Sequence, residues 1–173
     1  MTKVFHVAFS QILIVLMCFS VNSIAADSHE YKKPEDVVAW LYRDFAWEAI
    51  MGHTYWKNGS LLNQPREILS LYFSDELVSL ILKDRECVRE KHELCNLDFN
   101  PIFVSQDPAA TDLEISPADQ SSTVHVQFIY PSNMKRIELD FKVERTTRGW
   151  RISDIVYKEF LPLRKILSME LNK

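Results

Sequence analysis

The chain has 173 residues and a formal net charge of −4, with 20 Lys and Arg against 24 Asp and Glu. This mild acidity disfavours nucleic-acid binding, which needs a basic surface. Only three glycines are present, which leaves little room for a phosphate-binding loop. The length suits one domain with its own hydrophobic core.

The N-terminal stretch MTKVFHVAFSQILIVLMCFSVNSIAAD has the layout of a secretory signal peptide. Lys3 supplies the positive charge, residues 12–21 form an apolar run, and small residues follow at Ala25 and Ala26. The apolar run is shorter than the roughly 20 residues that cross a bilayer. We therefore predict a signal peptide over residues 1–25, export to the periplasm and no membrane span.

Cys18 offers an alternative, in which an acylated cysteine becomes the mature N-terminus. Met17 argues against it, because a lipid-modification site has a small residue directly before the cysteine. We expect no lipid anchor. Removing Lys3 with the signal peptide leaves 19 Lys and Arg against 24 Asp and Glu, a net charge of −5. The mature chain of roughly 147 residues is expected to be one exported domain, and its acidity suits a basic partner.

Helices are predicted first in the mature chain. A proline, two acids and then apolar residues at every fourth position predict a helix over residues 34–51, which ends before Gly52. Pro65 begins a second helix. Ser74 caps a third helix, which has one apolar face and ends near Cys87.

Beyond the second cysteine of the mature chain the pattern changes to period two. Apolar and polar residues alternate in STVHVQFIY (122–130) and KRIELDFKVE (135–144), as in half-buried antiparallel strands. WRISDIVY (150–157) is predicted as the last strand, and a shorter strand is expected near Thr111. Pro162 begins an amphipathic C-terminal helix. Helices followed by a run of strands predict an α+β fold with helices packed on one sheet face.

Cys87 and Cys95 remain after the signal peptide is removed. An even count of cysteines in an oxidising compartment favours a disulfide. Residues eight apart on a continuous helix are separated by roughly 12 Å, whereas a disulfide needs Cα atoms within about 7 Å. The helix must therefore end between them. A zinc site that includes His92 lacks the paired ligand spacing, and a catalytic thiol needs a reduced cysteine, so we predict no metal and no other cofactor.

Inward-facing polar residues are the candidates for a pocket. Asp154 is in phase with Trp150 and Ile152 on the last strand, so it is predicted to point toward the core. There it acts either as a base with a raised pKa or as a carboxylate tied to backbone donors or an arginine. Trp150 belongs to the same candidate pocket, and Asp98 and Gln106, at the beginning of the sheet, complete it.

A second candidate site is a partner-binding surface at His53, Tyr55 and Trp56, which follow the first helix. The alternative is that these aromatic residues cover the core from the side. His125 alternates out of phase with the apolar residues of its strand and is predicted to lie on the surface. No Ser-His-Asp order, paired carboxylates or HExxH motif is present, so no catalytic residue and no enzyme activity are predicted.

The order of helices, LDFNPIFVSQDP (97–108) and strands that close with GWRISDIVY (149–157) resembles a periplasmic family of unknown function with a nuclear-transport-factor-2-like, or cystatin-like, fold. The most specific pieces are Asp98-Phe99, Gln106-Asp107 and GWRISDI. The resemblance covers residues 34–157 and implies N-terminal helices packed on a curved antiparallel sheet that forms a cone. The C-terminal helix over residues 158–173 lies outside it.

The resemblance implies a fold more than a function, because related folds host isomerases, dehydratases, ligand binders and immunity proteins. The leading hypothesis is an exported, non-catalytic binding module for another envelope or secreted protein, as an immunity protein or an accessory subunit. The alternative is a small-molecule binder or an enzyme that uses the cone pocket, with Asp154 as its polar anchor.

Overall fold

The computed structural model describes residues 31–51, 59–117 and 122–170. The predicted signal peptide with Cys18, and the candidate partner surface at His53, Tyr55 and Trp56, lie outside the described residues. Among the residues described, no helix has both the length and the apolar character needed to span a membrane.

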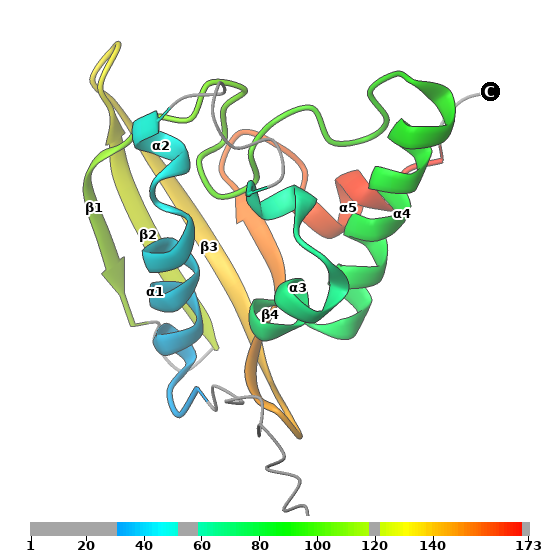
Figure 1. Ribbon diagram of the computed structural model, residues 1–173. Helices are drawn as coiled ribbons and strands as arrows, with labels where there is room; N and C mark the ends of the chain where they lie inside the picture. The colour runs from blue at the N-terminus through cyan, green and yellow to red at the C-terminus, as the bar shows by residue number, and fades with distance from the viewer. Residues whose placement is uncertain (1–30, 52–58, 118–121, 171–173) are drawn as a thin grey trace, which may run out of the picture.

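A four-stranded antiparallel sheet forms one layer of the fold (Figure 1). Each strand pairs with the next along the chain, in the order β1-β2-β3-β4. The α+β class and the predicted strands are therefore confirmed. The strand bounds are β1 Thr111–Ser116, β2 Thr123–Tyr130, β3 Lys135–Thr146 and β4 Gly149–Tyr157.

The helices form the second layer. In Figure 1, α1 covers one face of the sheet, whereas α3, α4 and α5 lie together beside β4. The five-residue helix α5 fits the predicted C-terminal helix over only part of its expected length. The bounds are α1 Pro34–Phe45, α2 Glu48–Met51, the 3₁₀ turn η1 Leu61–Asn63, α3 Arg66–Tyr72, α4 Asp75–Lys91 and α5 Leu163–Leu167.

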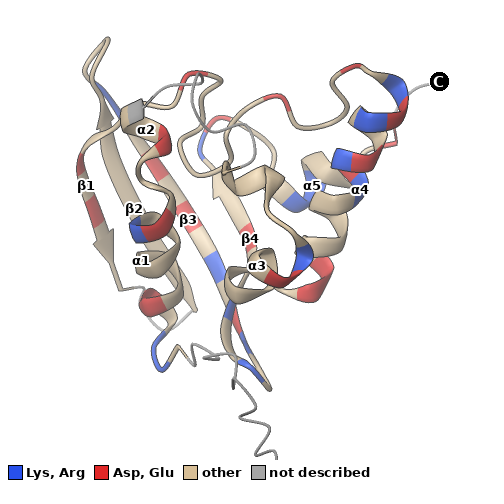
Figure 2. Cartoon of the chain, viewed as in Figure 1, with Lys and Arg blue, Asp and Glu red and all other residues tan. Residues whose placement is uncertain are grey.

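The sheet has one apolar face and one polar face. On β2 and β3 the residues that face the helices are buried, among them Val124, Phe128 and Phe141, whereas Lys142 and His125 on the other face are exposed. Figure 2 shows acidic and basic positions spaced along β3. The period-two pattern thus predicted the face that each strand buries, and His125 lies on the surface as predicted.

The predicted first helix is interrupted, which corrects the expectation of one helix over residues 34–51. α1 ends at Phe45, and the backbone N–H of Ala46 donates to the Tyr42 carbonyl before α2 begins. Beyond the break the backbone bonds span three residues, as in Ala49 N–H to the Ala46 carbonyl, and the Glu48 carboxylate accepts the distant Leu61 backbone N–H at 2.6 Å. A local pattern of apolar residues carries no information about that partner.

A β-bulge interrupts β4 and changes the expected direction of Asp154. Lys142 is in register with Asp154 and Val143 with Ile152, which leaves Ser153 as an extra residue. Asp154 is therefore in register with exposed Lys142 and out of phase with buried Ile152. The predicted shared phase of Asp154 and Ile152 is wrong, because strict alternation assumes a strand without a bulge.

The beginning of α4 is fixed against β4. The Ser74 hydroxyl accepts the Leu77 backbone N–H at 3.3 Å, which is the predicted N-cap. The backbone N–H of Ser74 itself donates to the Ile152 carbonyl at 2.9 Å. Ser74 therefore bonds to the backbone of β4 and also starts α4, the longest of the described helices.

Two buried tyrosines hold the loop between α4 and β1. The Tyr42 hydroxyl donates to the Ile102 carbonyl at 2.7 Å, and the Tyr157 hydroxyl donates to the Pro101 carbonyl at 3.2 Å. Burial raises the pKa of both phenols well above the ordinary value of 10, so both remain protonated donors. Phe103 then packs edge to face on Tyr42, with ring centroids 5.7 Å apart.

Replacing Tyr42 with Phe is expected to lower the free energy of unfolding by about 2 kcal/mol, because the buried Ile102 carbonyl loses its donor. Tyr130→Phe is the matched control, since the Tyr130 hydroxyl bonds to the Asp107 carbonyl at the surface, and its expected change is within about 0.5 kcal/mol. Urea unfolding of the mature protein measures both. Equal losses in the two variants would contradict the role given to Tyr42.

Candidate functional site

A cleft of about 450 Å³ opens at the end of the sheet where the β2–β3 turn lies. This volume is within the range of ligand pockets, roughly 300–1,000 Å³. Its apolar wall consists of Phe103, Val104, Tyr130, Ile137, Tyr157 and Phe160. Its polar wall consists of Ser105, Asn133, Lys135, Arg136, Glu138, Lys158 and Glu159.

The cleft lies where the pairing between β3 and β4 ends. Tyr157 is the last residue of β4, and it is in register with Leu139. Beyond Tyr157 the chain passes the beginning of β3 without ladder pairing, which leaves space between them. Phe160 closes this space from one side, since its ring stacks on Phe99 at 5.8 Å and meets Tyr157 at 6.4 Å.

The floor of the cleft is aromatic. Phe103 and Tyr157 are buried, and the Tyr157 hydroxyl is already bonded to the Pro101 carbonyl. The floor therefore presents rings and no free acid or base.

Two ion pairs lie at the rim of the cleft. Lys135 pairs with Glu159 at 2.7 Å, and Lys158 pairs with Glu138. The side chains of Lys135 and Glu159 are 48% and 62% exposed, so this pair contributes at most about 1 kcal/mol to stability. Both pairs join the beginning of β3 to the chain that follows β4.

Three exposed apolar residues belong to the cleft lining or lie next to it in the chain. Met134 is 72% exposed, Phe160 53% and Leu161 50%. Met134 lies between the lining residues Asn133 and Lys135, and Leu161 follows the lining residue Phe160. Apolar surface gathered around a cleft is typical of a binding site.

Asp154, the predicted polar anchor, does not line this cleft. Its carboxylate accepts the backbone N–H groups of Ile155 at 2.8 Å and of Arg164 at 2.9 Å. Because Arg164 belongs to the first turn of α5, Asp154 satisfies an N-terminal donor of that helix. Burial raises the pKa of Asp154, and the two backbone hydrogen bonds lower it in part. The observed contacts are those of a carboxylate that positions a helix.

The other three predicted pocket residues also lie outside the cleft lining. Trp150 donates its indole N–H to the Lys32 carbonyl at 3.2 Å, which fastens the first described residues to β4. Asp98 and Gln106 are exposed. The structure therefore does not bring the four predicted residues together around this cavity.

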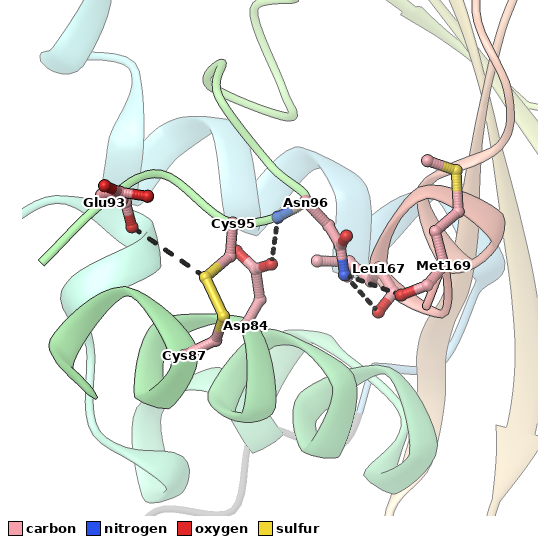
Figure 3. The surroundings of a disulfide bond; sticks show 7 residues. All are labelled: Asp84, Cys87, Glu93, Cys95, Asn96, Leu167 and Met169. Atoms are coloured by element: carbon pink, nitrogen blue, oxygen red, sulfur yellow. Dashed lines mark hydrogen bonds between the residues drawn. A yellow bond between two sulfur atoms is a disulfide. The ribbon is translucent and has the colours of Figure 1, made fainter. Parts of the chain in front are cut away.

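Figure 3 shows the predicted disulfide between Cys87 and Cys95, whose Cα atoms are 6.2 Å apart. α4 ends at Lys91, and His92 takes a left-handed conformation with φ of 58°. The predicted helix end between the two cysteines is thus confirmed. The helix runs about one turn further than expected, because its end is set by His92 and not by Cys87.

The segment after the disulfide is held by hydrogen bonds on both sides (Figure 3). Asp84 accepts the Asn96 backbone N–H at 2.8 Å. The Asn96 amide in turn donates to the carbonyls of Leu167 at 3.3 Å and Met169 at 3.2 Å, at the end of α5. Phe99 follows and stacks on Phe160 of the cleft wall. The disulfide therefore belongs to the support of one side of the cleft.

The sequence analysis did not find the cleft residues, because they come from the loop 103–105, the β2–β3 turn and the end of β4. One signal was available. Phe160 is an aromatic residue three positions beyond the last strand, and it is exposed and not needed for the core.

Comparisons with known proteins leave the function to the geometry of the site. No family model, no curated protein and no solved structure matches the chain. Across the described ranges, no group of three or more His, Cys, Asp or Glu side chains is placed to hold a metal ion. The aromatic cleft is therefore the best candidate site.

Reduction of the disulfide is expected to lower the free energy of unfolding by about 2.5 kcal/mol, because the unfolded chain regains the freedom of a closed loop. We expect amide hydrogen exchange to rise in α5 and at Phe160, which the disulfide segment supports. Exchange in β2 is the internal control and stays unchanged under native conditions. Faster exchange in β2 without any change in α5 would contradict this role.

Glu48 makes stability depend on pH. Its carboxylate is buried and accepts the Leu61 N–H and the Asn100 amide, and burial raises its pKa above the ordinary 4.5. The folded protein then holds this proton more tightly than the unfolded chain does, so stability falls as the pH rises from 4.5 through the folded pKa. Glu48→Gln removes this loss.

The free energy of unfolding of the wild type minus that of Glu48→Gln is therefore expected to decrease between pH 4 and pH 7. The subtraction cancels the other titrating groups, and urea unfolding at each pH measures it. A difference that stays constant or increases with pH would show that burial does not raise this pKa.

Proposed function

We propose that the protein is an exported, non-catalytic binding module for another envelope or secreted protein, and that the aromatic cleft is its contact site. The observation that carries the proposal is the cleft with exposed Phe160 in its lining and with exposed Met134 and Leu161 directly beside lining residues in the chain. Aromatic pockets that receive a side chain of the partner dominate the energetics of many protein interfaces. An immunity protein and an accessory subunit both fit this description.

The chemistry of the lining supports binding over catalysis. A general acid or base acts where its pKa is shifted toward the working pH and where it reaches the substrate. In this cleft the buried floor consists of rings. Four of the ionisable lining residues lie in exposed pairs of opposite charge, and Arg136 donates to the Gln127 amide oxygen. The buried carboxylates Glu48 and Asp84 and the half-buried Asp154 are bonded to backbone N–H groups outside the lining.

Export is supported by the N-terminal sequence and by the disulfide, because cysteine pairs persist in oxidising compartments. A nuclear-transport-factor-2-like cone is the finer fold that we propose. It is supported by a continuous antiparallel sheet with its helices on one face and by a cleft at one end of that sheet.

A small-molecule binder is the second candidate function, and the cleft volume of about 450 Å³ favours it. Its polar contacts are then the rim residues and not Asp154, which serves α5. The two candidates differ in what remains bound when the protein is isolated gently.

Native mass spectrometry of the mature protein isolated from the exported fraction tests the proposal. We expect a stoichiometric protein companion, which Met134→Ser reduces at least tenfold because it removes apolar contact area beside lining residues. Leu94→Ser is the matched control, since Leu94 is 70% exposed and, unlike Met134, has no lining residue beside it in the chain. Equal amounts of companion in both variants would overturn the cleft as the contact site.

A further inference from the structure

The cleft carries a local excess of basic side chains in an acidic protein. Its lining includes Lys135, Arg136 and Lys158 against Glu138 and Glu159, whereas the whole chain has 24 acidic and 20 basic residues. Interfaces pair patches of opposite charge, and such pairing selects partners. The net positive charge of the lining therefore favours an occupant that carries an acidic group.

The rim is open to a new carboxylate. The Lys135–Glu159 pair is exposed on both sides, so an incoming carboxylate can take the place of Glu159 at a small cost in free energy. Arg136 donates to the neutral Gln127 amide oxygen at 2.8 Å and pairs with no carboxylate among the described residues. Two of the three basic side chains at the rim are therefore available to an acidic occupant.

The aromatic floor lies next to this basic rim. An occupant that uses both needs an apolar body against Phe103, Tyr157 and Phe160 and an anionic group close to Lys135. The exposed apolar residues Met134 and Leu161 lie outside the lining, each directly beside a lining residue in the chain. A small molecule inside the cleft leaves these two residues uncovered, whereas a protein partner covers them.

From these observations we infer that the cleft receives a partner-protein segment in which an aromatic or branched aliphatic side chain lies next to a carboxylate. The inference rests on the proposed function and names the chemistry of the partner. The apolar side chain packs on the aromatic floor, and the carboxylate replaces Glu159 as the partner of Lys135.

Two probes with the same indole body separate this inference from the proposed function. In ¹⁵N NMR titrations of the oxidised mature protein, N-acetyltryptophan and its neutral amide are both expected to shift the amides of Ser105, Ile137 and Phe160. The carboxylate probe is expected to bind about threefold more tightly, the contribution of one exposed ion pair. Equal affinities would overturn the acidic partner and leave the cleft as the site. If neither probe shifts these amides, the proposed function fails as well.

Substitutions of the two residues in the Lys135–Glu159 ion pair are expected to change the binding affinity in opposite directions. Lys135→Gln is expected to weaken N-acetyltryptophan binding about threefold, and Glu159→Gln is expected to strengthen it about twofold by removing the competing carboxylate. Lys165→Gln on α5, which is exposed and outside the lining, is the control and leaves the affinity unchanged. If both rim variants weaken binding equally, the pair only holds the wall, and the exchange of partners is overturned.

A free amphipathic anion has the same chemistry as this segment and is the competing occupant. Native mass spectrometry separates the two, because a companion protein supports the segment. A retained small organic anion, displaced by N-acetyltryptophan, would overturn the choice of a protein partner.

Discussion

A buried carbonyl group needs a donor, and in the loop between α4 and β1 the carbonyls of Ile102 and Pro101 receive theirs from Tyr42 and Tyr157. One tyrosine comes from α1 and the other from the end of β4, so the loop joins the helical layer to the sheet. These hydrogen bonds place Phe103 under the cleft. They also occupy the one hydroxyl on the aromatic floor, which leaves the floor apolar. The shape and the chemistry of the cleft thus depend on the same two contacts.

The support of the cleft continues outward through the disulfide segment. Asp84 and the Cys87–Cys95 bond fix Asn96, whose amide holds the end of α5. Asp154 holds the beginning of the same helix through the Arg164 N–H. Cys87, Cys95 and Asp154 therefore have a structural role. They hold in place the segment that carries Phe160. Polar groups of this kind fix one arrangement of the chain, because each loses its hydrogen bonds if the segment moves.

The structural features that could be predicted from the sequence are those that residues close together in the chain determine. Alternation along residues 122–130 and 135–144 identified two strands and their buried faces, because one side of such a sheet is covered, and Ser74 was identified as a cap by its local chemistry. Contacts between distant segments were not predictable. Beyond the break in the first helix Glu48 bonds to distant Leu61, and the bulge at Ser153 reverses the direction of Asp154. The cleft was missed for the same reason, since its wall combines three separate segments.

The central claim is that a partner protein occupies the cleft. Its most direct test places benzoylphenylalanine at position 160, where a half-exposed aromatic ring already lines the cavity, and irradiates cells that export the protein. Mass spectrometry then identifies the cross-linked peptide. We expect one partner protein, joined through a segment with an apolar residue next to Asp or Glu. Cross-links only to a small molecule, or to a partner segment without an acidic residue, would contradict a protein occupant of this chemistry.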